Sequence, residues 1–215
     1  SSAAPLVSGA AALLASANRR PGGQLRAALQ DTAVPVGTGL GDGRIDVLAA
    51  LRAVPSFRDI AGNVHAGNIE ALAAARITVG CDATRFCPRR KVTRGQIATF
   101  LDRALDLPDG THAFTDVPAD HPHAEGIGAV AGAGIAEGCG PARFCPAGGL
   151  TRAQMATLLQ RALDLPDGPP RFRDVPDDHV HARGIRAIAA AGITAGCAPE
   201  RFCPGATVTR AQMAS

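Results

Sequence analysis

Aromatic residues are scarce in this chain: Trp and Tyr are absent, and aromatics make up 3% of the 215 residues. Such a chain offers few flat side chains on which bases could stack, and its formal net charge is only +3. We therefore expect no nucleic-acid partner. Because 46% of the residues are hydrophobic, a buried core is expected, and Ala and Gly must supply much of its close packing.

Long apolar runs are also missing. No stretch reaches the roughly 18 apolar residues that a membrane-spanning helix requires. The opening segment, SSAAPLVSGAAALLAS, is interrupted by Pro5, Ser8 and Gly9. It lacks the initiator Met and the basic region that precede the apolar part of a secretion signal, although ASA at 15–17 resembles a cleavage site. We therefore expect neither membrane insertion nor a signal peptide here.

Three copies of one unit occupy the rest of the chain. The segments GCDATRFCPRRKVTRGQIATFL, GCGPARFCPAGGLTRAQMATLL and GCAPERFCPGATVTRAQMAS place their first Cys 58 residues apart, and FRDI, FTDV or FRDV precedes each. We predict repeats at 57–108, 114–166 and 172–215, the third being truncated. One copy cannot bury its apolar faces alone, so the three are expected to share a core.

Each copy contains two stretches with the apolar spacing of a helix, one on each side of a Cys-bearing loop. In the first copy the apolar positions are Ile69, Leu72, Ala73 and Ile77, and then Ile97, Phe100, Leu101, Ala104 and Leu105. The same spacing recurs in the other copies, and DLPDG ends both complete ones with helix-stopping residues. We expect all-α repeats.

The cysteines all follow the pattern C-x5-C; they are Cys81, Cys87, Cys139, Cys145, Cys197 and Cys203. An even count fixed in a repeat predicts one disulfide per copy and an oxidising compartment outside the cell. The alternative is a metal site, because His65, His123 and His181 also recur. Zinc prefers four ligands with closer Cys spacing, so we favour disulfides and predict no metal. The pairs His121/His123 and His179/His181 are interpreted as surface residues at a helix start.

A TRxQ motif opens the second helix of each copy, with Thr at 93, 151 and 209. It is a capping box, in which the Thr and Gln side chains satisfy free backbone N–H groups. Capping does not explain Arg94, Arg152 and Arg210, because a cation at a helix N-terminus opposes the helix dipole. These arginines are expected to have a partner. The candidates are an anionic ligand or the carboxylates of Asp59, Asp116 and Asp174.

The pattern FxDV, GIxxGC, FCP and VTRAQMA resembles the S-layer homology repeat in its cysteine-containing form, from Phe57 to Ser215. The resemblance implies a pseudo-threefold helical bundle that binds anionic, often pyruvylated, cell-wall polysaccharide in grooves between repeats. The positions that correspond to the family's binding Arg and turn Gly are Arg94, Arg152, Arg210, Gly80, Gly138 and Gly196. The chain departs from the family in having Gln for its Glu, and Pro122 at a common Trp position.

The first 55 residues resemble the C-terminal end of a subtilisin-like serine protease domain, which would be an α/β fold. Pro5 and Gly9 match the motif G-T-S-x-A-x-P-x-x-x-G, which places the nucleophile at Ser1. GQLRAALQDTAVPV and GDGRIDVLAAL resemble later segments, so the match extends from Ser1 to about Val54. The alternative is a small Ala-rich helical domain with incidental serines.

These resemblances together predict a secreted, wall-associated serine endopeptidase that acts on peptide substrates. Its catalytic His and Asp would lie upstream, so this chain alone would be inactive, because a Ser hydroxyl needs a general base. No cofactor is predicted, and any calcium sites of the protease family would also lie upstream. The alternatives are a non-catalytic surface-binding protein with a degenerate protease remnant, and a metal-binding repeat protein.

Overall fold

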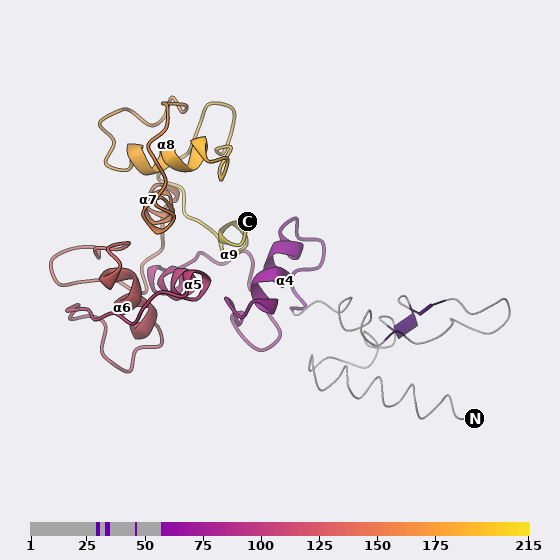
Figure 1. The fold of residues 1–215 in the computed structure, drawn as a ribbon. Helices are drawn as coiled ribbons and strands as arrows, with labels where there is room; N and C mark the ends of the chain where they lie inside the picture. Colours follow the sequence, from indigo (N-terminus) through magenta and orange to yellow (C-terminus); the bar gives the residue numbers. More distant parts are fainter. Residues whose placement is uncertain (1–28, 31–32, 35–45, 47–56) are drawn as a thin grey trace, which may run out of the picture. The chain divides into compact units, whose positions relative to one another are not determined.

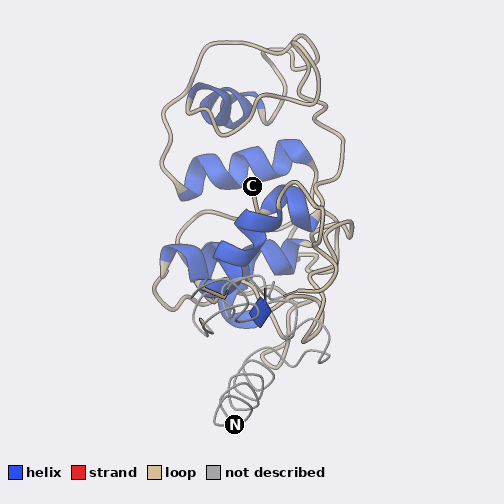
Figure 2. Cartoon of the chain, turned by 90° about the vertical axis from the view of Figure 1, so that its right-hand side faces the viewer, coloured by secondary structure: helices blue, strands red, loops and turns tan. Residues whose placement is uncertain are grey.

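The computed structural model describes residues 29–30, 33–34, 46 and 57–215 (Figure 1). The chain divides into two compact units, one of Ser1–Ala73 and Val79–Phe86, the other of Ala74–Thr78 and Cys87–Ser215. The helices are α4 (Ala66–Ala74), α5 (Arg94–Leu105), α6 (Ala124–Gly132), α7 (Arg152–Ala162), α8 (Ala182–Ala190) and α9 (Arg210–Met213). Loops and isolated bridges connect them, and the described ranges contain no extended strand (Figure 2).

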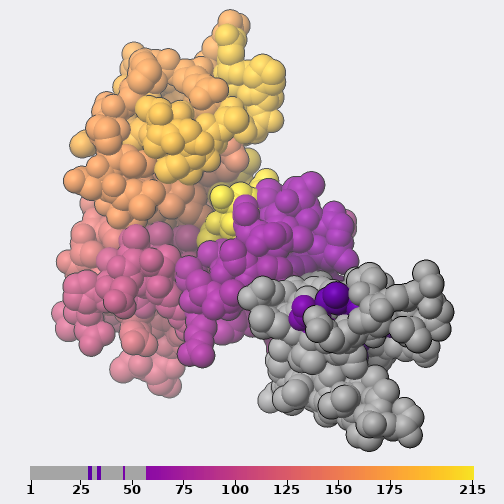
Figure 3. Space-filling model, turned by 45° about the vertical axis from the view of Figure 1, so that its right-hand side comes forward, coloured from indigo at the N-terminus to yellow at the C-terminus, as the bar shows by residue number. Residues whose placement is uncertain are grey.

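The α/β part expected at residues 1–55 lies almost wholly outside the described residues, which are those coloured by residue number in Figure 3. The described chain from residue 57 onward is helical, as the repeat pattern predicts. No helix in the described part of the chain is both long and apolar enough to cross a membrane.

The first unit contains the start of the first repeat. Ile69, on α4, is fully buried. Phe57 packs against Phe86 with ring centroids 5.5 Å apart, and Phe86 donates its N–H to a carboxylate oxygen of Asp59 at 2.8 Å. The Phe residue of the FxD motif therefore packs against the Phe residue of the FCP motif within the same repeat.

The second unit repeats this arrangement twice. Phe114 packs on Phe144 at 5.3 Å, and Phe172 packs on Phe202 at 5.4 Å. Helix α5 packs against α6, and α7 packs against α8. The second helix of one repeat therefore packs on the first helix of the next repeat, which explains why a single repeat cannot complete its core.

The strips of chain that precede α5, α7 and α9 meet in a closed ring of backbone hydrogen bonds. Val92 donates to Val208 at 2.9 Å, Val208 donates to Leu150 at 3.0 Å, and Leu150 donates to Val92 at 3.3 Å. All three residues are buried. The ring gives the second unit a pseudo-threefold centre, around which the N-termini of α5, α7 and α9 are placed (Figure 1).

The first helix of each repeat is shorter than the apolar spacing predicts. Helices α6 and α8 end at Gly132 and Ala190, before Ile135 and Ile193. The chain turns at Gly134, whose φ of 69° favours glycine, and Ile135 then donates its N–H back to Val130. Ile135 thus reaches the core from a helix-ending turn and not from the helix face that its spacing indicates.

Candidate functional site

Helices α5, α7 and α9, whose N-termini surround the ring, are called the central helices here, and their N-termini are fully capped. Thr93 accepts the N–H of Gln96 and the Gln96 side chain accepts the N–H of Thr93, so the predicted capping box is confirmed; α7 and α9 have the same box. The N–H of Arg94 donates to Gly148, and that of Gly95 donates to Pro146. The first free N–H groups of α5 are therefore satisfied by the FCP loop of the next repeat, as any buried helix end requires.

Each of two central arginines crosses to the next repeat. Arg94 donates Nε–H to the carbonyl oxygen of Phe144 at 2.8 Å, and its guanidinium carbon lies 4.9 Å from the centre of the Phe144 ring. Arg152 makes the same pair of contacts with Phe202, at 2.8 Å and 4.7 Å. A guanidinium that stacks on a ring and donates to a carbonyl is held in a fixed orientation.

The carboxylates of Asp116 and Asp174 accept backbone N–H groups from the same FCP loops whose carbonyl oxygens bind the arginines. Asp116 accepts the N–H groups of Phe144 and Cys145, both at 2.8 Å, and its ion pair is with Arg143 at 3.7 Å. Asp116, the carboxylate alternative for Arg94, forms no ion pair with it within the described residues. Arg94 and Asp116 instead hold opposite sides of one peptide segment. Asp174 binds the third FCP loop in the same way.

Disulfides close these loops. Cys139 is bonded to Cys145, and Cys197 to Cys203, with Cα atoms 6.0 Å apart in each pair. Cys81 and Cys87 are likewise in the disulfide-bonded form. The second Cys of each pair has a left-handed φ near 59°. The disulfide prediction is confirmed, and bonded cysteines are not available as thiolate ligands.

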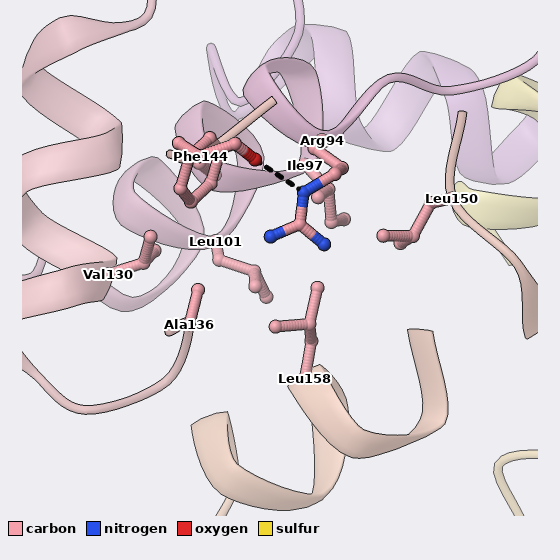
Figure 4. Close-up of a pocket in the computed structure, with 9 residues that line it drawn as sticks. Arg94, Ile97, Leu101, Val130, Ala136, Phe144, Leu150 and Leu158 are labelled. Atoms are coloured by element: carbon pink, nitrogen blue, oxygen red, sulfur yellow. Dashed lines mark hydrogen bonds between the residues drawn. The ribbon is translucent and has the colours of Figure 1, made fainter. Parts of the chain in front are cut away.

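A narrow pocket surrounds the guanidinium of Arg94 (Figure 4). Its wall is apolar and comes from α5, α6, α7 and the loops of the second repeat; the lining residues are Ile97, Ala98, Leu101, Val130, Ala136, Phe144, Leu150 and Leu158. The two Nη atoms of Arg94 point into this apolar space, on the side away from the Phe144 carbonyl (Figure 4). Within the described residues, no hydrogen bond engages either Nη atom.

Burial affects the electrostatics of both arginines. Desolvation lowers the pKa of Arg94, and the charge of Asp116 opposes this shift. Arg152 shows the same lowering of its pKa by desolvation, with Asp174 opposing it. Its Nη2 atom is buried and has no hydrogen-bond partner among the residues that the structure describes. A guanidinium stays protonated in proteins, so each site holds a partly desolvated cation with spare donors.

The third arginine, Arg210, is more deeply buried, with 2% of its surface exposed. Its guanidinium carbon lies 5.7 Å from the ring centre of Phe100, and its backbone N–H donates to the carbonyl oxygen of Arg90 at 2.8 Å. All three predicted arginines thus lie at the start of a central helix, and Arg94 and Arg152 have matching contacts in their own surroundings.

The predicted glycines lie behind the FxD phenylalanines. Gly138 and Gly196 have φ of 95° and 93°, and a Cβ on Gly138 would lie 3.0 Å from the Phe114 ring. In the first unit, a Cβ on Gly80 would lie 2.5 Å from the Phe57 ring. The turn and the close ring both require glycine, which is a structural reason for the motif. Their role in ligand binding stays a prediction.

Two of the recurring histidines, His123 and His181, join one repeat to the next. His123 is the N-cap residue of α6, as expected for a residue at a helix start, but it is half-buried and its Nδ1 lies 2.8 Å from the Thr99 hydroxyl of α5. His181 and Thr157 repeat this contact. Among the described residues, no group of three His, Cys, Asp or Glu side chains is arranged to hold a metal ion.

The sequence analysis did not identify two features of this site: the acceptors of the arginine side chains and the contact between Thr99 and His123. The acceptor for each arginine is a main-chain carbonyl, which no residue type marks. The Thr99 contact could have been found, because Thr at 99 and 157 recurs with the repeat period. Ser1, the predicted nucleophile, lies outside the described residues.

The chain is similar in sequence to several known proteins. The chain is 33% identical over 78% of its length to amylopullulanase from Thermoanaerobacterium thermosulfurigenes, and 30% identical over 74% to the S-layer protein of Bacillus thuringiensis subsp. finitimus. It is 33% identical over 59% of its length to an uncharacterized cell wall amidase of Bacillus anthracis. It spans about a tenth of the amylopullulanase and a fifth of the S-layer protein.

The sequence profile of the S-layer homology domain matches three segments, 56–98, 113–156 and 171–214. These segments contain the paired phenylalanines, the disulfide loops and the capped arginines described above. The chain therefore belongs to the S-layer homology domain family.

Proposed function

We propose that this chain is the wall-binding part of a cell-surface protein and that its central arginines hold acidic groups of a cell-wall polysaccharide. S-layer homology domains bind cell-wall polysaccharide, and the family and its S-layer relatives place the chain at the cell surface, in association with the wall. What we add is that Arg94 and Arg152 bind the anionic groups of that polymer.

The buried, unpartnered Nη2 of Arg152 is the observation on which this proposal depends most. A desolvated cation with a spare donor is costly in the free protein, and a carboxylate or phosphate is the group that best satisfies it. Arg94 offers both of its Nη atoms inside an apolar pocket (Figure 4). The pocket has room for about one water-sized group, which matches a single anionic oxygen.

Co-sedimentation of the chain with purified cell-wall sacculi tests this function. We expect the wild-type chain to pellet with the sacculi, and the double variant Arg94→Gln/Arg152→Gln to remain mostly in solution. Arg103→Gln is the matched control, because Arg103 is an exposed cation in the last turn of α5. Equal binding by the folded double variant and the control would remove the proposed role of the arginines.

A second candidate, serine endopeptidase activity of the longer protein, rests on the sequence pattern of Ser1, Pro5 and Gly9. Relatives of this chain include proteins named as enzymes and proteins named for the S-layer. A segment similar to this chain therefore occurs both in proteins named as enzymes and in proteins that are not. Treatment of the full-length native protein with a fluorophosphonate probe, followed by peptide mapping, tests this candidate. Labelling at Ser1 would support it; unlabelled, folded protein would leave wall binding as the function.

A further inference from the structure

The loop before α5 carries three consecutive cations that its counterparts lack. Arg89, Arg90 and Lys91 are all exposed. The equivalent positions are Ala147, Gly148 and Gly149 in the second repeat, and Gly205, Ala206 and Thr207 in the third. The three repeats therefore differ strongly in charge at this loop, although their backbones are equivalent there. We call residues Arg89 to Lys91 the cationic loop.

The backbone of the cationic loop is held as firmly as those of its counterparts. Arg90 donates its N–H to Cys87 and accepts the N–H of Arg210, while Lys91 forms a bridge with Thr209. Gly148 and Ala206 form the corresponding bonds in the other repeats. The three cations are therefore displayed from an ordered support, which lowers the entropy cost of binding a ligand.

The charge of the cationic loop is not neutralised locally. None of its three side chains forms an ion pair within the described residues. Residues 83–101 contain five cations and no carboxylate, whereas the rest of the chain carries 17 Lys and Arg against 19 Asp and Glu. This segment alone accounts for the positive net charge, so the positive field that attracts anions is strongest around it.

We propose that the cationic loop is a second binding surface for the wall polymer, one that contacts a run of repeated carboxylate or phosphate groups along the polysaccharide. The inference rests on the proposed function, and it adds a surface distinct from the arginine pockets. Three exposed charges in a row match a ligand whose charges repeat, whereas the half-buried Arg94 and Arg152 each match a single acidic group. The absence of Trp and Tyr argues against nucleic acid, which is usually held by stacking as well as charge.

Exchanging loops between repeats tests the proposal with little risk to the fold. Arg89→Gly/Arg90→Ala/Lys91→Thr gives the first repeat the residues of the third. Gly205→Arg/Ala206→Arg/Thr207→Lys makes the reverse exchange, and a Cβ on Gly205 would meet no atom within 4 Å. Both variants of the 215-residue chain would first be checked for wild-type circular dichroism and thermal unfolding.

Binding would be measured by fluorescence anisotropy against polygalacturonate and poly(glycerol phosphate), with dextran and single-stranded DNA as comparison probes. We expect the first variant to bind its preferred polyanion about tenfold more weakly at low salt, with a shallower salt dependence, and the reverse variant to bind more tightly. The preferred polymer distinguishes carboxylate from phosphate.

Unchanged affinity and salt dependence in the first variant would overturn the inference while leaving wall binding intact. Tighter binding of the wild type to DNA than to either polymer would also overturn it. Failure of the wild type to bind sacculi would instead overturn the proposed function, and the inference with it.

Discussion

Arg94 and Asp116 hold the same peptide segment of the second repeat from opposite sides. The Nε of Arg94 donates to the carbonyl oxygen of Phe144, while Asp116 accepts the N–H of Phe144 itself. One charged residue comes from the preceding repeat and the other from the same repeat. The Phe144 loop is thereby fixed at the junction of the two repeats, next to the pocket that Arg94 enters.

Loss of one arginine should reduce stability as well as binding. Arg152→Ala removes a charge-assisted hydrogen bond to Phe202 and the stacking on its ring, so we expect the free energy of unfolding to fall by about 2 kcal/mol. Urea unfolding followed by circular dichroism measures the change. Arg103→Ala, on an exposed surface, should stay within about 0.5 kcal/mol of the wild type; equal losses in the two variants would contradict the assigned contacts.

Removing one disulfide should weaken the fold without abolishing it. Cys139→Ala/Cys145→Ala opens a short loop, and we expect a loss of about 2 kcal/mol, measured by thermal or urea unfolding. Titration of the untreated wild type with a thiol reagent should detect no free thiol in the described part of the chain. Free thiols in protein purified without reductant would contradict the disulfide assignment.

The geometry that recurs behind the FxD phenylalanines predicts a sharp difference between two nearby glycines, Gly138 and Gly140. Gly138→Ala places a Cβ at a left-handed φ, against the Phe114 ring and the Arg143 carbonyl, and should cost about 1–3 kcal/mol. Gly140→Ala is the control, since a Cβ there meets no atom within 4 Å. Thermal unfolding of both variants gives the comparison, and equal melting temperatures would show that the turn at Gly138 tolerates a side chain.

Stability should fall in acid partly through Asp116. The N–H of Phe144 is the main cause of the lowering of the Asp116 carboxyl pKa below its ordinary 3.8. Because the folded pKa is depressed, this contribution is present above pH 3.8 and is lost as the pH falls through the lower, folded value. Urea unfolding from pH 6 down to pH 2 should show a smaller acid-induced loss for Asp116→Asn than for the wild type. Identical pH profiles would exclude the carboxylate from this role.

The sequence predicts those features that depend on short, local patterns. The capping box at Thr93 and the C-x5-C disulfides are each defined within a few residues, and both are present. The period of the repeat predicts the helix–loop–helix unit, and the family match confirms three such domains. Domain boundaries and the ligand-binding roles of residues stay predictions.

Other features depend on packing between repeats, which local patterns do not encode. The spacing of Ile135 is that of a helix face, yet the helix ends before it, because a turn at Gly134 brings it to the core instead. The sequence predicts His123 to be a surface residue, but it is half-buried and contacts Thr99 of α5. The partner of Arg94 could not be predicted, because the acceptor is a backbone oxygen.

The ring formed by Val92, Leu150 and Val208 uses every donor and acceptor that these three residues present toward the centre. Linear arrays can grow by duplication, since each end offers a free face for another copy. Here no such face remains at the centre: a fourth copy would have to break an existing bond before it could join. The bonding of this centre is therefore complete with three repeats, and a further repeat would have to pack elsewhere.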